Sequence, residues 1–452
     1  MALPEAFIKR TKAILGDEFE AFEKALQTTP PTSVRVNDKM EHHPSGNHVA
    51  WCETGYYLDE RPLFTADPLF HAGVYYVQEA SSMFLEQAVK QHFPDARTVL
   101  DLCAAPGGKS TLLSQALPES SILVSNEIIR SRAYILAENL IKWGNPNCVV
   151  TNNEPKDFDT LPGFFDAVVI DAPCSGEGMF RKDAGAIQEW SEYNVKLCAE
   201  RQRDILATIW DTLKTDGILV YSTCTFNREE NEENVHWICD ELGAEVLRID
   251  LQGNTDITAS DCGYRFYPHK TTGEGFFLSV MKKTSNVNRT IKNKKDEKKG
   301  IKFVTKNFTT TLALKGPERW SIIPEGNLFK AYDNERLTDF LLLNKSLKCM
   351  HSGLLLGEMK GSDFIPAASM ALSKALDKDS VEIIDVDYNT SILFLRKEAI
   401  FLPEAKRGYL LICYKGQSLG WVKNMGNRCN NLYPQEWRIR MKIQSAKEEL
   451  FE

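Results

Sequence analysis

The chain has 452 residues, of which 43% are hydrophobic and 26% charged, a composition typical of a globular protein with two or three domains. It has no long apolar run and no apolar block near its first residues, which argues against a membrane span and a signal peptide, so we expect a cytoplasmic protein with no membrane partner. The formal net charge of −8 conceals an asymmetry, because residues 1–283 carry 26 Lys and Arg against 42 Asp and Glu, whereas residues 284–452 carry 28 against 20.

The first 90 residues predict a small α/β region. Apolar side chains recur at roughly helical spacing over residues 3–28, and this pattern ends at a Pro-Pro pair. The run SVRVN at 33–37 then alternates like a strand. Residues 71–83 lead into another helical pattern, which we expect to connect this region to the main domain.

Residues 91–283 alternate between strand-like and helical stretches, which predicts a parallel sheet covered by helices on both faces. The strand-like runs are TVLDL at 98–102, SILVSN at 121–126, NCVVTN at 147–152, FDAVVID at 165–171, GILVYST at 217–223 and GFFLSVM at 275–281. In such folds ligands bind at the carboxyl ends of the strands. The residues that end a run and are suited to chemistry are Asp101, Glu127, Asp171 and Cys224. We expect these four to share one edge of the sheet.

The segment TVLDLCAAPGGKS at 98–110 predicts a strand, a tight loop and a helix, which together form a cradle for a small molecule. A phosphate-binding loop is excluded because Cys103 stands where that motif needs its first glycine, and the spaced glycines of a dinucleotide fingerprint are absent. Glu127 stands at the end of a second strand, where a carboxylate can accept from both hydroxyls of a ribose. A ribose-bearing cofactor without a pyrophosphate is favoured, and an ordinary strand-to-helix turn with a solvated Glu127 is the alternative.

The eleven cysteines, an odd number without a C-x-x-C pair, predict reduced thiols and no metal site. Cys174 and Cys224 each follow a strand, and Asp171 precedes Cys174. A lone cysteine at a strand end is more often part of the core, but two of them beside a carboxylate and a cofactor loop favour catalysis. A thiolate can add to carbon 6 of cytosine when an acid hydrogen-bonds N3, which lets carbon 5 attack a methyl group. Release needs a base for the carbon 5 proton, so one thiol, one carboxylate and one further acid–base group suffice.

Residues 284–302 are rich in Lys and Asn with almost no apolar content, which predicts a basic linker. Residues 303–452 begin with a helical piece and continue as strand-like runs separated by glycines, which predicts a small, largely β module at the end. The basic balance of the chain after residue 283 makes its C-terminal part the expected binding region for a nucleic acid.

Several of these stretches resemble one family. CAAPGGK at 103–109, DAPCSGEGMFRKD at 171–183, STCT at 222–225 with NREENEENV at 227–235, and RFYPHKTTGEGFF at 265–277 are similar to the Nol/Nop/Sun family of RNA cytosine-C5 methyltransferases, and the chain looks most like its bacterial RsmF-type 16S rRNA members. SVRVN and HAGVYYVQEASS resemble the N-terminal region of the family. The resemblance implies a Rossmann-like S-adenosylmethionine-dependent methyltransferase sheet over 91–283, an N-terminal α/β RNA-binding region over 1–90, and an RNA-binding region over 303–452 that ends in a mostly β PUA-like module.

The resemblance also implies roles for individual residues. Cys224 would be the nucleophile, Cys174 would assist release, and Asp171 would contact the target base. S-adenosylmethionine would be bound by Cys103, Ala104, Ala105, Pro106, Gly107, Gly108, Lys109, Glu127, Glu154 and Asp171. Glu154 stands where the family usually has Asp.

The end of the chain, with GQSLGWVKNM and NNLYPQEWRIR, looks like a PUA-type RNA-binding domain. Its candidate phosphate contacts are Lys423, Arg428, Arg438 and Arg440. We expect methylation of carbon 5 of cytosine in 16S rRNA, as free RNA or within the small ribosomal subunit. The alternatives are a tRNA cytosine-C5 methyltransferase, a non-catalytic RNA-binding ribosome assembly factor, and a DNA methyltransferase, whose nucleophile would be the cysteine of the Pro-Cys motif.

Overall fold

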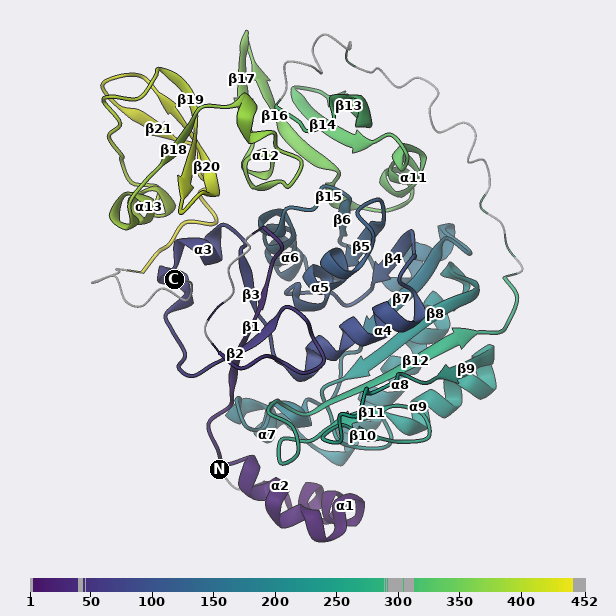
Figure 1. Cartoon of the computed structure of the whole chain (residues 1–452). Coiled ribbons are helices and arrows are strands. Elements are labelled where there is room, and N and C mark those ends of the chain that lie inside the picture. The colour runs from purple at the N-terminus through teal and green to yellow at the C-terminus, as the bar shows by residue number, and fades with distance from the viewer. Residues whose placement is uncertain are drawn as a thin grey trace.

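The structure, a computed structural model, describes residues 3–39, 44, 46–287, 289, 291, 304 and 313–441. Most of the predicted linker at 284–302 and the beginning of the region that follows it lie outside these residues. Within the part of the chain that the structure describes, no helix combines the length and the apolar character needed to cross a membrane. A large central sheet flanked by helices dominates the molecule, and two smaller sheets from the last third of the chain lie beside it (Figure 1).

The central sheet has ten strands in the order β10-β11-β12-β8-β7-β4-β5-β6-β15, with β9 pairing with β12. Its parallel strands are β4 (Thr98–Asp101), β5 (Ile122–Asn126), β6 (Cys148–Thr151), β7 (Phe165–Asp171) and β8 (Leu213–Thr223). The strand order changes direction at β4, which lies between β5 and β7, and open α/β sheets bind their ligands at such a point.

The prediction of a parallel sheet is confirmed for the first five runs and was wrong for the sixth. The last run forms β12 (Phe276–Lys283), which is antiparallel to β8. Apolar patterning predicts a strand but not its direction, and β12 follows β11 after the segment 267–275 and pairs antiparallel with it. The other strands of this sheet are β9 (Ala244–Leu247), β10 (Thr258–Ala259), β11 (Tyr264–Phe266) and β15 (Cys349–Ser352).

Helices cover both faces of the sheet, as the sequence predicts. One face packs against α4 (Leu85–His92), α5 (Gly108–Ala116) and α6 (Arg130–Trp143), and the other against α8 (Glu192–Ile209) and α9 (Glu232–Trp237). Neighbouring residues of one strand point to opposite faces, so Val99 lies in the first core and Leu100 in the second. Both are fully buried, and β4 is thereby fixed at the centre of the molecule.

The N-terminal region combines helices with a small antiparallel sheet of order β2-β1-β3. Its elements are α1 (Glu5–Leu15), α2 (Phe19–Ala25), β1 (Thr32–Val36), β2 (Gly55–Leu58), α3 (Pro68–His71) and β3 (Tyr75–Val77). The first two helices pack against the region of the central sheet, because their aromatic side chains share a buried cluster with residues that follow β7, β8 and β11. This cluster contains Phe7, Phe19, Phe22, Phe180, Trp190, Phe226 and Tyr267.

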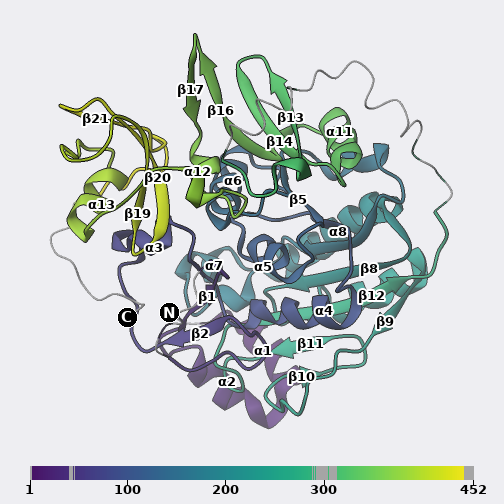
Figure 2. The same ribbon diagram turned by 45° about the horizontal axis from the view of Figure 1, so that its top comes forward.

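The last third of the chain forms two four-stranded sheets, both visible at the top of Figure 2. The first has the order β13-β14-β16-β17, with β13 (Trp320–Glu325), β14 (Leu328–Asp333), β16 (Leu354–Lys360) and β17 (Asp363–Pro366). The second has the order β18-β19-β20-β21, with β18 (Ile383–Asp385), β19 (Gly408–Tyr414), β20 (Gln417–Asn424) and β21 (Cys429–Asn431). The helices of this part are α11 (Leu337–Ser346), α12 (Ala368–Leu372) and α13 (Tyr388–Leu395). The short α7 (Ala184–Glu189) lies earlier in the chain, between β7 and α8.

These pieces give the predicted α/β class, with a Rossmann-like sheet, an N-terminal α/β region and a largely β end. One strand crosses the predicted division, because β15 pairs with β6 and extends the central sheet. The second small sheet also packs against the N-terminal sheet, where Leu410 and Ile412 share a core with Val34 and Tyr75. The domain boundaries at 90, 283 and 303 stay a prediction.

Candidate active site

The two cysteines that follow strands lie side by side at the carboxyl edge of the central sheet. Cys174 follows β7 and Cys224 follows β8, and these strands are paired with Asp171 opposite Ser222. The two sulfur atoms are 3.2 Å apart. Both side chains are only partly exposed, and all eleven cysteines of the chain are free thiols. The hydrogen bond to Cys224 and burial hold the pKa of the Cys174 thiol well above its usual range.

Asp171 lies beside the cysteines at the tip of β7. Its Oδ1 accepts a hydrogen bond from Ser222 Oγ at 2.8 Å, and its Oδ2 lies 2.9 Å from Lys109 Nζ. Burial alone would lower the pKa of Lys109, but the adjacent Asp171 carboxylate raises it, so the lysine keeps its charge. Lys109 comes from the first turn of α5, and the ion pair therefore joins the glycine loop to the tip of β7.

The loop at 103–109 connects β4 to α5 and is held from the side by α6. Gly107 has a φ of 120°, a conformation that strains residues with a side chain, and α5 begins at the next residue. Arg132 Nη2 donates to the carbonyl oxygen of Ala105 at 2.8 Å, and Asn139 Nδ2 donates to that of Pro106 at 2.8 Å. The helix can therefore offer its first N–H groups to a ligand in a fixed loop.

Asp101, at the tip of β4, is fully buried beneath this loop. One carboxylate oxygen accepts from Ser110 Oγ at 2.6 Å, while Oδ1 has no hydrogen-bond partner among the described residues. Burial raises the pKa of Asp101 to about 7, with Asp171 and Glu127 adding to the effect. An unpaired buried polar atom is costly, so this oxygen indicates a ligand that donates to it.

Glu127 directly follows β5 and is only 4% exposed. Its Oε1 accepts from the backbone N–H of Ile129 at 2.8 Å, and its Oε2 lies 3.3 Å from Arg132 Nη1. The carboxylate is thus fixed next to the loop that Arg132 also holds. The structure brings Asp101, Glu127, Asp171 and Cys224 to one edge of the sheet.

Glu154, in contrast, is exposed and forms a capping box with Asp157 at the start of a 3₁₀ helix (Pro155–Thr160). The buried residue at this corner is the preceding Asn153, which the sequence analysis did not single out. Its Nδ2 donates to Asp157 Oδ2 at 2.9 Å, and its Oδ1 accepts from the backbone N–H of Lys348 at 2.9 Å. No local pattern signals this contact, because Lys348 lies almost 200 residues further along the chain.

The sequence analysis also missed two buried carboxylates behind the cysteines, Glu177 and Glu230. Both lie in quoted motifs, DAPCSGEG and NREENEENV, but the spacing of charged residues alone does not show which glutamates are buried. Glu230 Oε2 accepts from the backbone N–H of Ser175 at 3.0 Å and from Gln202 Nε2 at 2.7 Å. Burial raises the pKa of Glu230 even against these hydrogen bonds.

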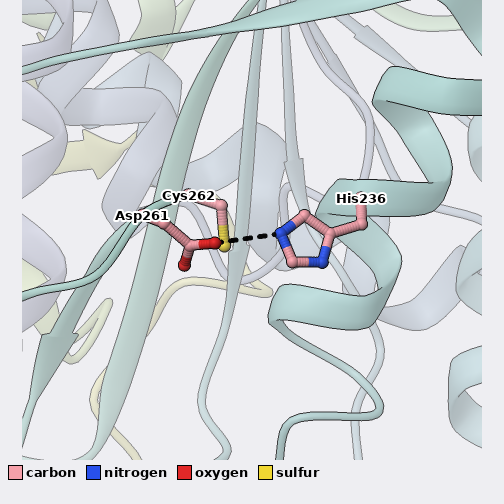
Figure 3. Close-up of side chains that lie close together, drawn as sticks. All are labelled: His236, Asp261 and Cys262. Atoms are coloured by element: carbon pink, nitrogen blue, oxygen red, sulfur yellow. Dashed lines mark hydrogen bonds and ion pairs between the residues drawn. The ribbon is translucent and has the colours of Figure 1, made fainter.

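Away from this site, His236, Asp261 and Cys262 place a nitrogen, an oxygen and a sulfur within 4.8 Å of one another (Figure 3). His236 Nε2 and Asp261 Oδ2 are 3.2 Å apart, and both side chains are exposed. Burial raises the pKa of Cys262 to about 12, whereas metal binding requires the thiolate. We interpret the group as an exposed His–Asp pair above a buried thiol, and the sequence-based expectation of no metal stays a prediction.

This interpretation predicts that chelation leaves the protein unchanged. Dialysis of the purified protein against EDTA should not change its melting temperature, because we interpret this group as holding no metal. Thermal melts before and after dialysis, with metal analysis of the protein, make the measurement. A melting temperature that falls on chelation and returns with Zn²⁺ would contradict it.

Three family models match the chain. Residues 90–282 match the 16S rRNA methyltransferase RsmB/F model, residues 3–80 the N-terminal domain of 16S rRNA methyltransferase RsmF, and residues 381–439 the methyltransferase RsmF PUA domain. The ribosomal RNA small subunit methyltransferase F of Vibrio vulnificus strain YJ016 is 30% identical, with 96% of this chain and 97% of the relative covered. The enzyme of the same name from Shewanella sp. strain MR-4 is 31% identical, with 89% and 90% covered.

Solved structures agree with the fold. A methyltransferase homolog protein from Pyrococcus horikoshii has a TM-score of 0.52 at 26% identity and covers 62% of this chain and 95% of its own. NSun6 from the same organism, solved with SFG, has a TM-score of 0.53 at 20% identity and covers 63% and 99%. Together with the relatives that match almost end to end, these findings show that the chain belongs to the ribosomal RNA small subunit methyltransferase F family, with the methyltransferase, N-terminal and PUA domains of that family.

Proposed function

We propose that this protein methylates carbon 5 of cytosine in 16S rRNA, with S-adenosylmethionine as the cofactor and a covalent cysteine–cytosine intermediate. The observation that carries the proposal is the pair of thiols 3.2 Å apart beside Asp171, at the same edge of the sheet as the glycine loop. Cytosine C5 is a poor nucleophile until a thiolate has added to C6. An enzyme of this family with two thiols at the carboxyl edge of its sheet is therefore suited to methylating C5.

The residues at the glycine loop fit a bound S-adenosylmethionine. A buried Asp101 oxygen without a partner can accept from a cationic amine, and the fixed Glu127 carboxylate can accept from ribose hydroxyls. We assign cofactor binding to the loop at 103–109, Glu127, Asp171 and the exposed Glu154. S-adenosylmethionine supplies the methyl group when bound.

We assign different roles to the two thiols. The hydrogen bond to Cys224 and burial raise the pKa of Cys174, which suits this residue to proton transfer during release. The similarity of STCT at 222–225 to the family motif leads us to assign Cys224 as the nucleophile that forms a bond to C6, with Asp171 positioned by Ser222 and Lys109 to hold the base at N3. After C5 is methylated, Cys174 passes its own proton to Cys224 and takes up the C5 proton in exchange. The C5–H electron pair forms the C5–C6 double bond as the C6–sulfur bond breaks, and Cys224 leaves as a thiol.

The RNA specificity in this proposal rests on the family and on the basic end of the chain. Arg428 and Arg440 are exposed and Arg438 is partly exposed, so these side chains are available to phosphates. Lys423 differs, because its Nζ is 2.5 Å from Asp363 Oδ2. Bisulfite sequencing of 16S rRNA and tRNA from a strain that lacks the gene tests the assignment. Loss of one or more methylated cytosines in 16S rRNA is expected, loss only in tRNA would redirect the enzyme to that substrate, and no loss would favour an assembly factor.

Replacing Glu127 with alanine should weaken cofactor binding, because charge-assisted hydrogen bonds to the ribose are lost, each worth roughly 1.5–3 kcal/mol. Isothermal titration of S-adenosylmethionine into the purified variant measures the change. Glu127→Gln is the matched control, since it keeps the shape and one acceptor but removes the charge. Unchanged affinity in Glu127→Ala would show that the ribose is held elsewhere.

A further inference from the structure

One buried carboxylate connects the two cysteine loops to the N-terminal helices. Glu177 follows Cys174 in the Pro-Cys loop, and its side chain is fully buried. Its Oε2 accepts from the backbone N–H of Phe226, two residues after Cys224, at 2.9 Å. Its Oε1 accepts from Trp190 Nε1 at 2.9 Å and pairs with Arg10 of α1. A single side chain therefore contacts the loop of each cysteine and a helix from the beginning of the chain.

A second set of buried bonds joins the same two loops. The backbone N–H of Gly178 donates to the carbonyl oxygen of Cys224 at 2.8 Å, and Ser175 Oγ lies 3.0 Å from Thr225 Oγ1. Asn227 Nδ2 lies 2.8 Å from Thr225 Oγ1 and 3.3 Å from Glu177 Oε1. The two loops are in close contact at Gly178, because a Cβ at this position would lie only 2.9 Å from the carbonyl oxygen of Cys224. The distance between the two thiols depends on these loops keeping their positions.

Aromatic packing extends the connection to the first two helices. Phe7 of α1 lies edge-on to Phe180 with ring centroids 5.0 Å apart, and Phe22 of α2 lies edge-on to Phe226 at 5.0 Å. The Arg10 guanidinium also lies over the Trp190 ring at 5.2 Å. Helix α1 thus packs against the segment that follows Cys174, and helix α2 packs against the segment that follows Cys224.

We propose that Glu177, held by Arg10, is a positioning residue that fixes the two thiols relative to each other. In this proposal helices α1 and α2 are a structural part of the catalytic centre. Glu177 does not touch the cysteine sulfurs, so it acts through the loops. The inference rests on the proposed function, because it concerns the step in which Cys174 and Cys224 act together. It assigns residues 5–25 a role beyond the RNA binding expected of the N-terminal region.

The carboxylate is required at this position because every neighbour donates to it. The donors are Arg10, Trp190, the Phe226 amide and Asn227. A glutamine amide in place of Glu177 has only one oxygen acceptor, and its NH₂ group would face groups that are themselves donors. We expect one of the two loops to move as a result. Displacements of about 1 Å in a catalytic group can lower a rate by about 100-fold.

The test measures methyl transfer to 16S rRNA with purified full-length variants. Glu177→Gln should lower kcat by about 100-fold, with the KM for RNA and the affinity for S-adenosylmethionine nearly unchanged, and should slow formation of the covalent RNA adduct to the same degree. Arg10→Gln should act in the same direction, the double variant should be no worse than Glu177→Gln, and Arg10→Lys, which keeps the charge, should recover part of the rate. Glu18→Gln is the control, since Glu18 lies beside the same helices but pairs with Lys270 at the surface.

Three results would overturn the inference. One is an unchanged kcat in Glu177→Gln. Another is a loss of cofactor affinity by the same factor as the loss of rate, together with a lower melting temperature. General destabilisation of the protein would then explain both losses. The third is a loss in the double variant equal to the product of the single losses, since Arg10 and Glu177 would then act independently. Inactive wild-type protein would instead contradict the proposed function.

Discussion

Replacing Cys224 with alanine should abolish both methyl transfer and covalent attachment to RNA. If Cys224 forms the bond to C6, its variant cannot begin the reaction, and loss of a covalent nucleophile lowers rates by several orders of magnitude. Replacing Cys174 with alanine should have a different result, because addition and methyl transfer precede the release step. Cys174→Ala should remain attached to its methylated RNA.

The measurement is an RNA-linked protein band that survives denaturing gel electrophoresis. We expect the band with Cys174→Ala and not with Cys224→Ala. Cys239→Ala is the control, because this half-buried cysteine lies outside the site and should leave turnover unchanged. A band with Cys224→Ala instead would make Cys174 the nucleophile, as in the DNA methyltransferase arrangement. Two active variants without a band would exclude a covalent mechanism.

The parts of this site that could be predicted from the sequence are those that local order determines. Each of Asp101, Glu127, Asp171 and Cys224 ends or follows a strand-like run, and parallel strands place such positions at one edge. The glycine loop at 103–109 could be predicted for the same reason, since its turn residues lie between a strand and a helix. These assignments need no knowledge of contacts between distant segments.

The parts that could not be predicted depend on segments far apart in the chain. Arg10 and Glu177 are 167 residues apart, and nothing in either neighbourhood indicates the other. The capping box that Glu154 forms with Asp157 is local, whereas Asn153 accepts a hydrogen bond from the backbone N–H of Lys348, which belongs to the last third of the chain. The role of Glu154 in cofactor binding stays a prediction. The direction of β12 could not be predicted either, because its apolar pattern fits a parallel or an antiparallel partner equally well.

The last third of the chain is therefore more than a detachable RNA-binding unit. The domain division predicted from the sequence implies that deletion of 303–452 leaves cofactor binding intact, since the glycine loop lies in another domain. In the structure, Phe340 and Leu343 of α11 are fully buried in the core under the central sheet, and the backbone N–H of Asn152 donates to the Lys348 carbonyl oxygen at 3.1 Å. We now expect the deletion to prevent stable folding of the methyltransferase sheet and so to abolish S-adenosylmethionine binding.

A single substitution at this interface makes the expectation quantitative. Phe340→Ala should lower the free energy of unfolding by about 3–5 kcal/mol, the usual cost of removing a buried phenylalanine ring. Glu335→Ala, at an exposed position just before the same helix, should change it by less than about 0.5 kcal/mol. Urea denaturation followed by circular dichroism measures both, and a deletion protein that folds and binds S-adenosylmethionine with wild-type affinity would contradict the argument. Phe340 shares one buried core with Leu100 of β4 and Val124 of β5. Because β4 ends at Asp101 and Glu127 follows β5, the end of the chain contributes to the core that supports the strands of the proposed cofactor site.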